Sequence, residues 1–188
     1  MTNFAGPIYS FEPDPQTFAL LRATAAGDPN WKIFNLALGA KNAVLPFNIM
    51  SMSVFNSFRK PAADNKVVTR TDISVVRLDD FIKDQGVSFH TAYLKTDTQG
   101  FDLEVLRGSA GIMDCIEAIQ TELSFLPIYE KTPDYHVVLR ELKSDGFALS
   151  GMYPVTLTNG QAIECDCILV REKPLSPEHH VGFQSVML

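Results

Sequence analysis

The chain has 188 residues and a mass of 20.9 kDa, which is the size of one domain, and its 46% hydrophobic residues exclude wholesale disorder. Sixteen Lys and Arg against 22 Asp and Glu give a net charge of −6, so we predict no nucleic-acid partner. The apolar stretches are too short for a transmembrane segment, and Met1–Gly6 has neither the basic nor the apolar part of a secretory signal. We therefore expect a cytoplasmic protein.

The first predicted elements are two short strands on either side of a helix. Residues Pro7–Phe11 form an apolar strand. Asp14 is placed to cap the following helix, which has Pro15 at its first position and ends at Gly27. A second strand covers Trp31–Leu38.

Residues 40–77 show a different pattern, which we interpret as a β-rich insertion. Polar turns that contain Pro and Asn separate three apolar pieces. The pieces that we predict as strands are Leu45–Met50, Ser53–Phe58 and Val67–Val76.

Helical periodicity returns at Leu78 and then alternates with strands to the end of the predicted domain at residue 172. The expected elements are a helix from Leu78 to Gly86, strand Thr91–Thr96, helix Asp102–Arg107, strand Ile116–Leu123, a helix capped by Thr132-Pro133, and strands Phe147–Leu149 and Cys167–Val170. Residues 173–188 are predicted to form a C-terminal tail.

This alternation of strands and helices is typical of βαβ units. We therefore predict an α/β fold with a mostly parallel sheet and helices on both faces. In such sheets ligands bind outside the carboxyl ends of the strands. The residues that the prediction places at those ends are Glu12, Ala37 to Gly39, Asp97 to Gly100, and Glu122 to Ser124.

Glu12 ends the first predicted strand. A carboxylate at this position of a nucleotide-binding sheet can accept hydrogen bonds from both ribose hydroxyls. The alternative is a solvated turn residue, or one that interacts favourably with the dipole of the following helix.

The densest polar cluster, Lys95 to Gly100, directly follows an apolar strand. Lys95 and Asp97 share a face of that strand because side chains alternate. They form either a structural ion pair or an active-site pair that binds and deprotonates a hydroxyl. Glu122 ends the next strand, where it and Asp97 could shift each other's pKa and act as a base or as metal ligands.

The cysteines predict no structural zinc site. Cys165 and Cys167 are two residues apart, and such a site needs a second pair of ligands. We interpret them as buried small side chains, and the prediction for this chain includes no metal.

Four segments together resemble the FkbM family of methyltransferases, in order and in spacing, over roughly residues 6–172. They are Tyr9-Ser10-Phe11-Glu12-Pro13, Asn35-Leu36-Ala37-Leu38-Gly39, residues 94–108 (Leu-Lys-Thr-Asp-Thr-Gln-Gly-Phe-Asp-Leu-Glu-Val-Leu-Arg-Gly), and Gln120-Thr121-Glu122-Leu123-Ser124. The third segment is the specific one.

The resemblance implies a Rossmann-like class I methyltransferase fold with a C-terminal antiparallel strand, and S-adenosylmethionine as the cofactor. It also implies methyl transfer to a hydroxyl oxygen of a saccharide, a glycolipid or a secondary metabolite, so the partner is a small-molecule or glycan acceptor. By this resemblance Glu12 binds the ribose, Ala37 and Leu38 line the adenine, and Lys95 and Asp97 lie at the active-site edge. We expect Asp97 to be the catalytic base or the group that orients the acceptor, with Lys95 and Glu122 in support.

The chain departs from the family at one point. A glycine-rich loop about 20 residues before the ribose acid binds the cofactor in this fold. Only 11 residues precede Glu12, and the sequence contains no Gly-x-Gly. The sequence therefore predicts that the first strand, its loop and its helix are missing from this chain. The alternative function is a non-catalytic Rossmann-like module, or an inactive methyltransferase fragment that has lost cofactor binding.

Overall fold

The computed structural model describes residues 6–62 and 67–173, so the predicted tail beyond residue 173 lies outside the described residues. The helices are α1 (Pro15–Ala25), α2 (Leu78–Asp84), α3 (Asp102–Arg107) and α4 (Tyr135–Ser144), with 3₁₀ turns η1 (Ser53–Phe55) and η2 (Ala110–Cys115). The strands are β1 (Ile8–Phe11), β2 (Trp31–Phe34), β3 (Ala37–Leu38), β4 (Ala43–Met50), β5 (Val67–Val76), β6 (Ala92–Lys95), β7 (Ile116–Ser124), β8 (Phe147–Thr158) and β9 (Gln161–Arg171). The mixed α/β class predicted from the sequence is confirmed.

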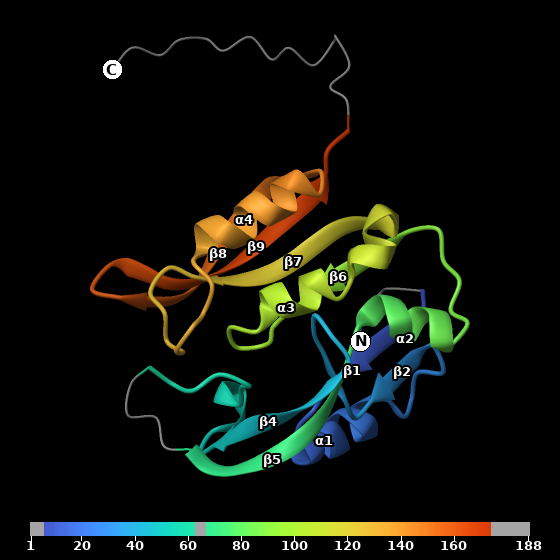
Figure 1. Cartoon of the computed structure of the whole chain (residues 1–188), viewed down its shortest axis with the longest axis horizontal. Helices are drawn as coiled ribbons and strands as arrows, with labels where there is room; N and C mark the ends of the chain where they lie inside the picture. The colour runs from blue at the N-terminus through green and yellow to red at the C-terminus, as the bar shows by residue number, and fades with distance from the viewer. Residues whose placement is uncertain (1–5, 63–66, 174–188) are drawn as a thin grey trace.

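The strands form three sheets, with orders β1-β2, β3-β5-β4 and β6-β7-β9-β8 (Figure 1). The β1/β2, β3/β5 and β6/β7 pairs are parallel. The β4/β5 pair and the two C-terminal pairs, β7/β9 and β8/β9, are antiparallel. The expected antiparallel strand at the C-terminal end is therefore present.

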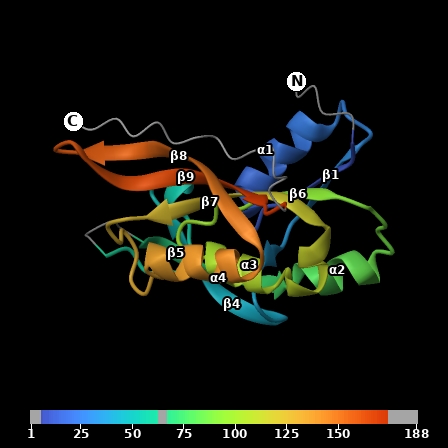
Figure 2. The ribbon, with the colours of Figure 1, turned by 90° about the horizontal axis from the view of Figure 1, so that it is seen from above.

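The main hydrophobic core lies between the four-stranded sheet and helices α3 and α4. Figure 2 shows both helices along one side of that sheet. Buried side chains from α3 (Leu103), β7 (Ile119) and α4 (Leu142) meet in this core. Because β6 and β7 are fixed on this core, the loops at their carboxyl ends have a rigid base.

A second, aromatic cluster joins the β1–β2 pair to α2. The ring of Phe81 on α2 meets Phe11 and Phe34 edge-on, with centroids 4.9 and 4.7 Å away. Such edge-to-face contacts add about 0.5–1.5 kcal/mol to the burial of the rings. They hold the end of β1, and with it Glu12, against the rest of the chain.

The predicted strand Trp31–Leu38 is wrong as one element. β2 pairs with β1, whereas β3 pairs with β5, so the chain changes partners between them. The break falls at Asn35, whose side-chain amide donates to the carbonyl oxygens of Glu12 and Pro13 at 2.8 and 3.1 Å.

The predicted strand Ser53–Phe58 is also wrong, because its first residues form η1. The N–H of Asn56 donates to the Ser53 carbonyl oxygen at 3.0 Å, and the Asn56 side chain accepts the N–H of Met50 at 2.8 Å. These local bonds take the backbone out of an extended conformation. A single bridge between Asn48 and Ser57 is what remains of strand pairing there.

The last two strands are much longer than predicted. Strands β8 and β9 form a hairpin through Asn159 and Gly160, whose φ angles of 51° and 78° are those of a tight two-residue turn. Strand β8 carries no charged residue and includes Pro154, and its register shifts three times.

Asp134, rather than the predicted Thr132-Pro133, caps α4 by accepting the N–H of His136 at 2.8 Å. In the described part of the chain no helix could span a membrane.

Candidate active site

The sheet brings Asp97 and Glu122 together, as the sequence predicts. Lys95 on β6 pairs with Gln120 on β7, and one residue further the Thr96 N–H donates to the Gln120 carbonyl oxygen at 2.8 Å. Continuing the same register by two residues sets Asp97 beside Glu122. The side-chain nitrogen of Gln99 lies 3.4 Å from both carboxylates.

Lys95 and Asp97 form the expected ion pair, with Nζ and Oδ2 3.1 Å apart. Burial alone would lower the pKa of Lys95, but the hydrogen bond and the charge of Asp97 outweigh it, so that pKa is raised. Both side chains are 49% exposed. Because exposed pairs contribute about 0–1 kcal/mol, the pair adds little to stability.

Glu122 lies among carboxylates. Burial raises its pKa to about 8, with further contributions from the charges of Glu164, Asp97, Asp102 and Asp166. A carboxyl group that titrates near neutral pH can both hold and accept a proton at working pH. Perturbed groups of this kind are concentrated at functional sites.

Asp102, which the sequence predicts only as the start of a helix, lies beside the candidate site. It is 5% exposed, and its Oδ1 has no hydrogen-bond partner of good geometry. Burial raises the pKa of Asp102 and the nearby hydroxyls of Thr96 and Thr98 oppose that shift. The sequence signal for a role of Asp102 is its position directly after the Gln-Gly-Phe turn. An acidic residue in the first turn of a helix also has a simpler explanation, since it interacts favourably with the helix dipole.

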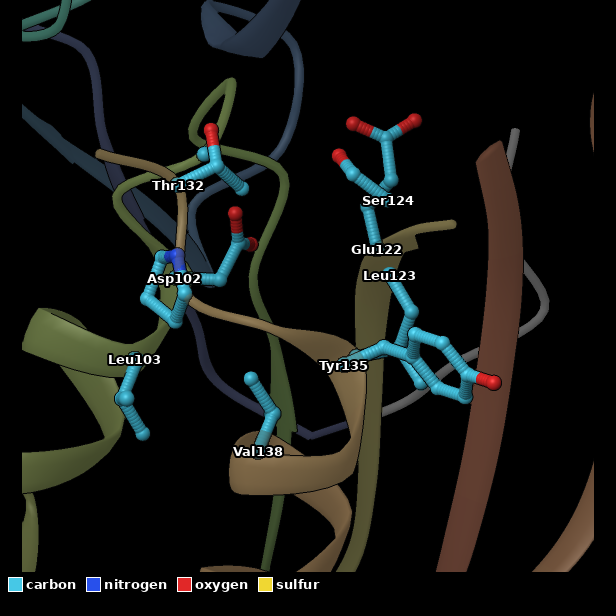
Figure 3. Close-up of a pocket in the computed structure, with 10 residues that line it drawn as sticks. Asp102, Leu103, Glu122, Leu123, Ser124, Thr132, Tyr135 and Val138 are labelled. Atoms are coloured by element: carbon cyan, nitrogen blue, oxygen red, sulfur yellow. The ribbon is translucent and has the colours of Figure 1, made fainter. Parts of the chain in front are cut away.

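A cavity of about 10 Å³ lies beside these acids, large enough for one water molecule. Figure 3 shows Asp102, Glu122 and Thr132 toward its upper end and Leu103 and Val138 toward its lower end. The cavity thus joins the polar loops at the strand ends to the apolar core. In the described residues no group of three or more potential ligands could hold a metal ion.

Glu12 stands at the carboxyl end of β1, as predicted. Its Oε1 accepts the N–H of Asp14 at 2.8 Å, and within the described residues its Oε2 accepts no hydrogen bond. Burial raises the pKa of Glu12, an effect that the Asp14 N–H opposes. One carboxylate oxygen therefore remains for a ligand.

Ala37 and Leu38 form β3, in which Ala37 is buried and Leu38 half-buried. The next residue, Gly39, packs against the ring of Phe101, because a Cβ at Gly39 would lie 3.1 Å from that ring. Phe101 follows Gly100 in the loop after β6. The segment from Ala37 to Gly39 and the Asp97 loop are therefore neighbours through Phe101.

Glu122→Gln should change how stability depends on pH. The raised pKa means that the folded protein keeps this proton while the unfolded chain loses it near pH 4.5, so stability falls as pH rises from 4.5 toward 8. We expect the variant to match the wild type near pH 4 and to be more stable by about 1–2 kcal/mol at pH 9, since partial exposure screens the effect. Urea unfolding at several pH values measures this, with Glu117→Gln on the same strand as control. Parallel curves for Glu122→Gln and the wild type would contradict the assignment.

Two known entities are similar to this chain, a family of sequences and a solved structure. A sequence model described as the methyltransferase FkbM domain matches residues 3–149. The crystal structure of methyltransferase FkbM from Methylobacillus flagellatus KT is similar with a TM-score of 0.55 and 14% identity. That likeness covers 88% of this chain but 36% of the solved one, so the chain spans about a third of that structure's length, and it supports the fold. No curated protein matches the chain.

Proposed function

The chain belongs to the FkbM methyltransferase family, and from that premise we propose that it is an S-adenosylmethionine-dependent O-methyltransferase domain. The acceptor would be a hydroxyl group of a saccharide, a glycolipid or a secondary metabolite. The observation that carries the proposal is the meeting of Asp97, Lys95 and Glu122 at the carboxyl ends of two parallel strands. The net charge of −6 supports an acceptor other than a nucleic acid.

The residues at the end of β1 fit the ribose of the cofactor. The free Oε2 of Glu12 is an acceptor for a hydroxyl donor, which is the chemistry that a ribose offers. Ala37 and Leu38 would line the adenine, as the family resemblance implies. The residue after them, Gly39, packs against Phe101 in the Asp97 loop. When bound, S-adenosylmethionine supplies a methyl group activated by a positively charged sulfur.

The roles of the remaining residues follow from their charges. Asp97 would accept the proton of the acceptor hydroxyl, since its carboxylate is half-exposed and available to a ligand. Lys95, whose Nζ lies 3.1 Å from the carboxylate, would orient Asp97. Glu122 would support Asp97 as a second proton acceptor, because it titrates near neutral pH.

In a protein that also carries a glycine-rich cofactor loop, Glu12→Ala should weaken binding of S-adenosylmethionine by roughly 1–3 kcal/mol, because hydrogen bonds from the ribose to a carboxylate are lost. Titration calorimetry on the wild type and the variant measures this difference. Glu172→Ala, which removes an exposed carboxylate at the end of β9, is the matched control and should bind like the wild type. Equal affinity of Glu12→Ala and the wild type would refute the ribose assignment.

The same titration separates the two functions considered for this sequence. A protein that also carries a glycine-rich cofactor loop, folds cooperatively and still binds no S-adenosylmethionine would favour the non-catalytic module over the methyltransferase. Binding without methyl transfer to any hydroxyl acceptor would leave the cofactor proposal standing and remove the proposal of O-methylation.

A further inference from the structure

Gln99 has an unusual backbone conformation in the loop between β6 and α3. Its φ of 53° lies in the left-handed region, and Gly100 follows with a φ of 83°. For a residue with a side chain this conformation costs on the order of 1 kcal/mol or more, so the surrounding structure must hold it. Strain of this kind is concentrated at functional sites.

The segment between β4 and β5 holds this loop in place. The fully buried hydroxyl of Ser57 donates to the Gln99 carbonyl oxygen at 2.8 Å. Arg59 donates through Nε to the carbonyl oxygen of Gly100 and through Nη1 to that of Lys131. Asn48 in turn fixes Ser57 and Arg59 by donating to both of their carbonyl oxygens. The β-rich insertion thus supports the loop that carries Gln99.

The Gln99 side chain connects both acidic residues of the proposed site. Its Nε2 is 3.4 Å from Oδ1 of Asp97 and 3.4 Å from Oε2 of Glu122. Its Oε1 lies 2.9 Å from the hydroxyl of Tyr129, which is buried. The same hydroxyl also lies 3.1 Å from the carbonyl oxygen of Phe55, and its one proton is assigned to Oε1 because that contact is the shorter. In this arrangement the amide turns its NH₂ group toward the two carboxylates.

We infer that Gln99 is a positioning residue, whose NH₂ group sets the spacing of Asp97 and Glu122 and whose orientation is fixed by Tyr129. The inference rests on the proposed function in so far as Asp97 and Glu122 are the catalytic pair. The bridging contacts themselves do not depend on it.

The surroundings of Glu122 explain why this donor matters. Carboxylates face Glu122 from the β6 loop (Asp97), from α3 (Asp102) and from β9 (Glu164 and Asp166). Lys95 is engaged with Asp97. The NH₂ of Gln99 is therefore a hydrogen-bond donor in an environment of acceptors, and it stabilises the charged form of Glu122.

The test is to titrate Glu122 by the NMR signal of its side-chain carboxyl carbon, in the whole chain. Gln99→Met keeps the length of the side chain and removes the donor, so we expect the pKa of Glu122 to rise by about 0.5–1 unit. Gln99→Glu adds a carboxylate at the same place and should raise it further. Gln85→Met, at an exposed position after α2, is the matched control and should leave the titration unchanged.

An unchanged titration in folded Gln99→Met or in folded Gln99→Glu would overturn the inference. Should the methionine variant not fold, the glutamate variant carries the test alone. Tyr129→Phe should shift the Glu122 titration in the same direction as Gln99→Met but less, because the amide is then free to rotate. These results need no methyl transfer, so a failure here is distinguishable from a failure of the proposed function. A purely structural role for Gln99 would change the melting temperature and leave the titration in place.

Discussion

In the proposed methyltransferase, once it is catalytically competent, Asp97→Asn should reduce methyl-transfer turnover by about 10²–10⁴-fold, the usual contribution of a positioned general base. Asparagine has nearly the same shape but cannot accept the proton of the acceptor hydroxyl. The side chain is 49% exposed and 3.1 Å from Lys95, so the substitution leaves the core intact. Formation of the demethylated cofactor, followed with a competent acceptor, measures turnover.

Three readouts on this variant separate the possible roles of Asp97. A base that faces the acceptor changes turnover and leaves cofactor affinity alone, whereas a carboxylate that touches the cofactor's amine changes affinity. A structural ion pair would lower the melting temperature, but a pair exposed to this degree contributes at most about 1 kcal/mol. The exposed residue Asp114 provides the control, Asp114→Asn. Full turnover in folded Asp97→Asn would show that Asp97 is not the base, and Glu122 would then be the next candidate.

Gly108→Ala should destabilise the fold by roughly 3 kcal/mol, and lower the melting temperature by about 6–12 °C. Gly108 ends α3 with a φ of −73°, which alanine also adopts, so the backbone conformation is no obstacle. The obstacle is space, because a Cβ at Gly108 would overlap the carbonyl oxygen of Gly39. That oxygen belongs to the backbone, so α3 or the end of β3 must move.

Gly27→Ala is the matched control for this prediction. A Cβ at Gly27 meets nothing within 4 Å, so we expect a neutral or slightly stabilising effect of up to about 1 kcal/mol. Differential scanning calorimetry on both variants measures the contrast. Equal melting temperatures would show that the β3 end and α3 are not locked together at this contact.

Local signals predicted the elements whose conformation depends on nearby residues. The helix Asp102–Arg107 was predicted with its observed bounds, because acidic residues in its first turn and Gly108 at its end both mark it. The Asn159-Gly160 turn is an equally local signal, and it marks the β8–β9 hairpin, which is not among the predicted elements.

The rest depended on partners far away in the sequence. The apolar pattern of residues 31–38 predicts one strand, because no residue in that segment indicates that β2 and β3 pair with different strands. The candidate site was likewise predicted in part. The α/β pattern predicts ligand binding at the carboxyl ends of the strands, and these ends hold Lys95, Asp97 and Glu122. The strain and contacts of Gln99 arise from Ser57 and Tyr129, which lie 42 and 30 residues away.

The composition and backbone geometry of strand β8 affect how easily molecules associate through this strand at high concentration. β8 is an outer strand of its sheet and has twelve residues without a charge, a composition that invites neighbouring molecules to add strands. Pro154 offers no N–H, and the three register shifts bend the strand, so a second molecule meets no straight run of hydrogen-bonding groups. At this edge the feature that hinders the addition of a strand is therefore backbone irregularity and not charge. Replacing Pro154, which is exposed, by a β-forming residue would restore one N–H to this edge and so remove one of the two irregularities that hinder the addition of a strand.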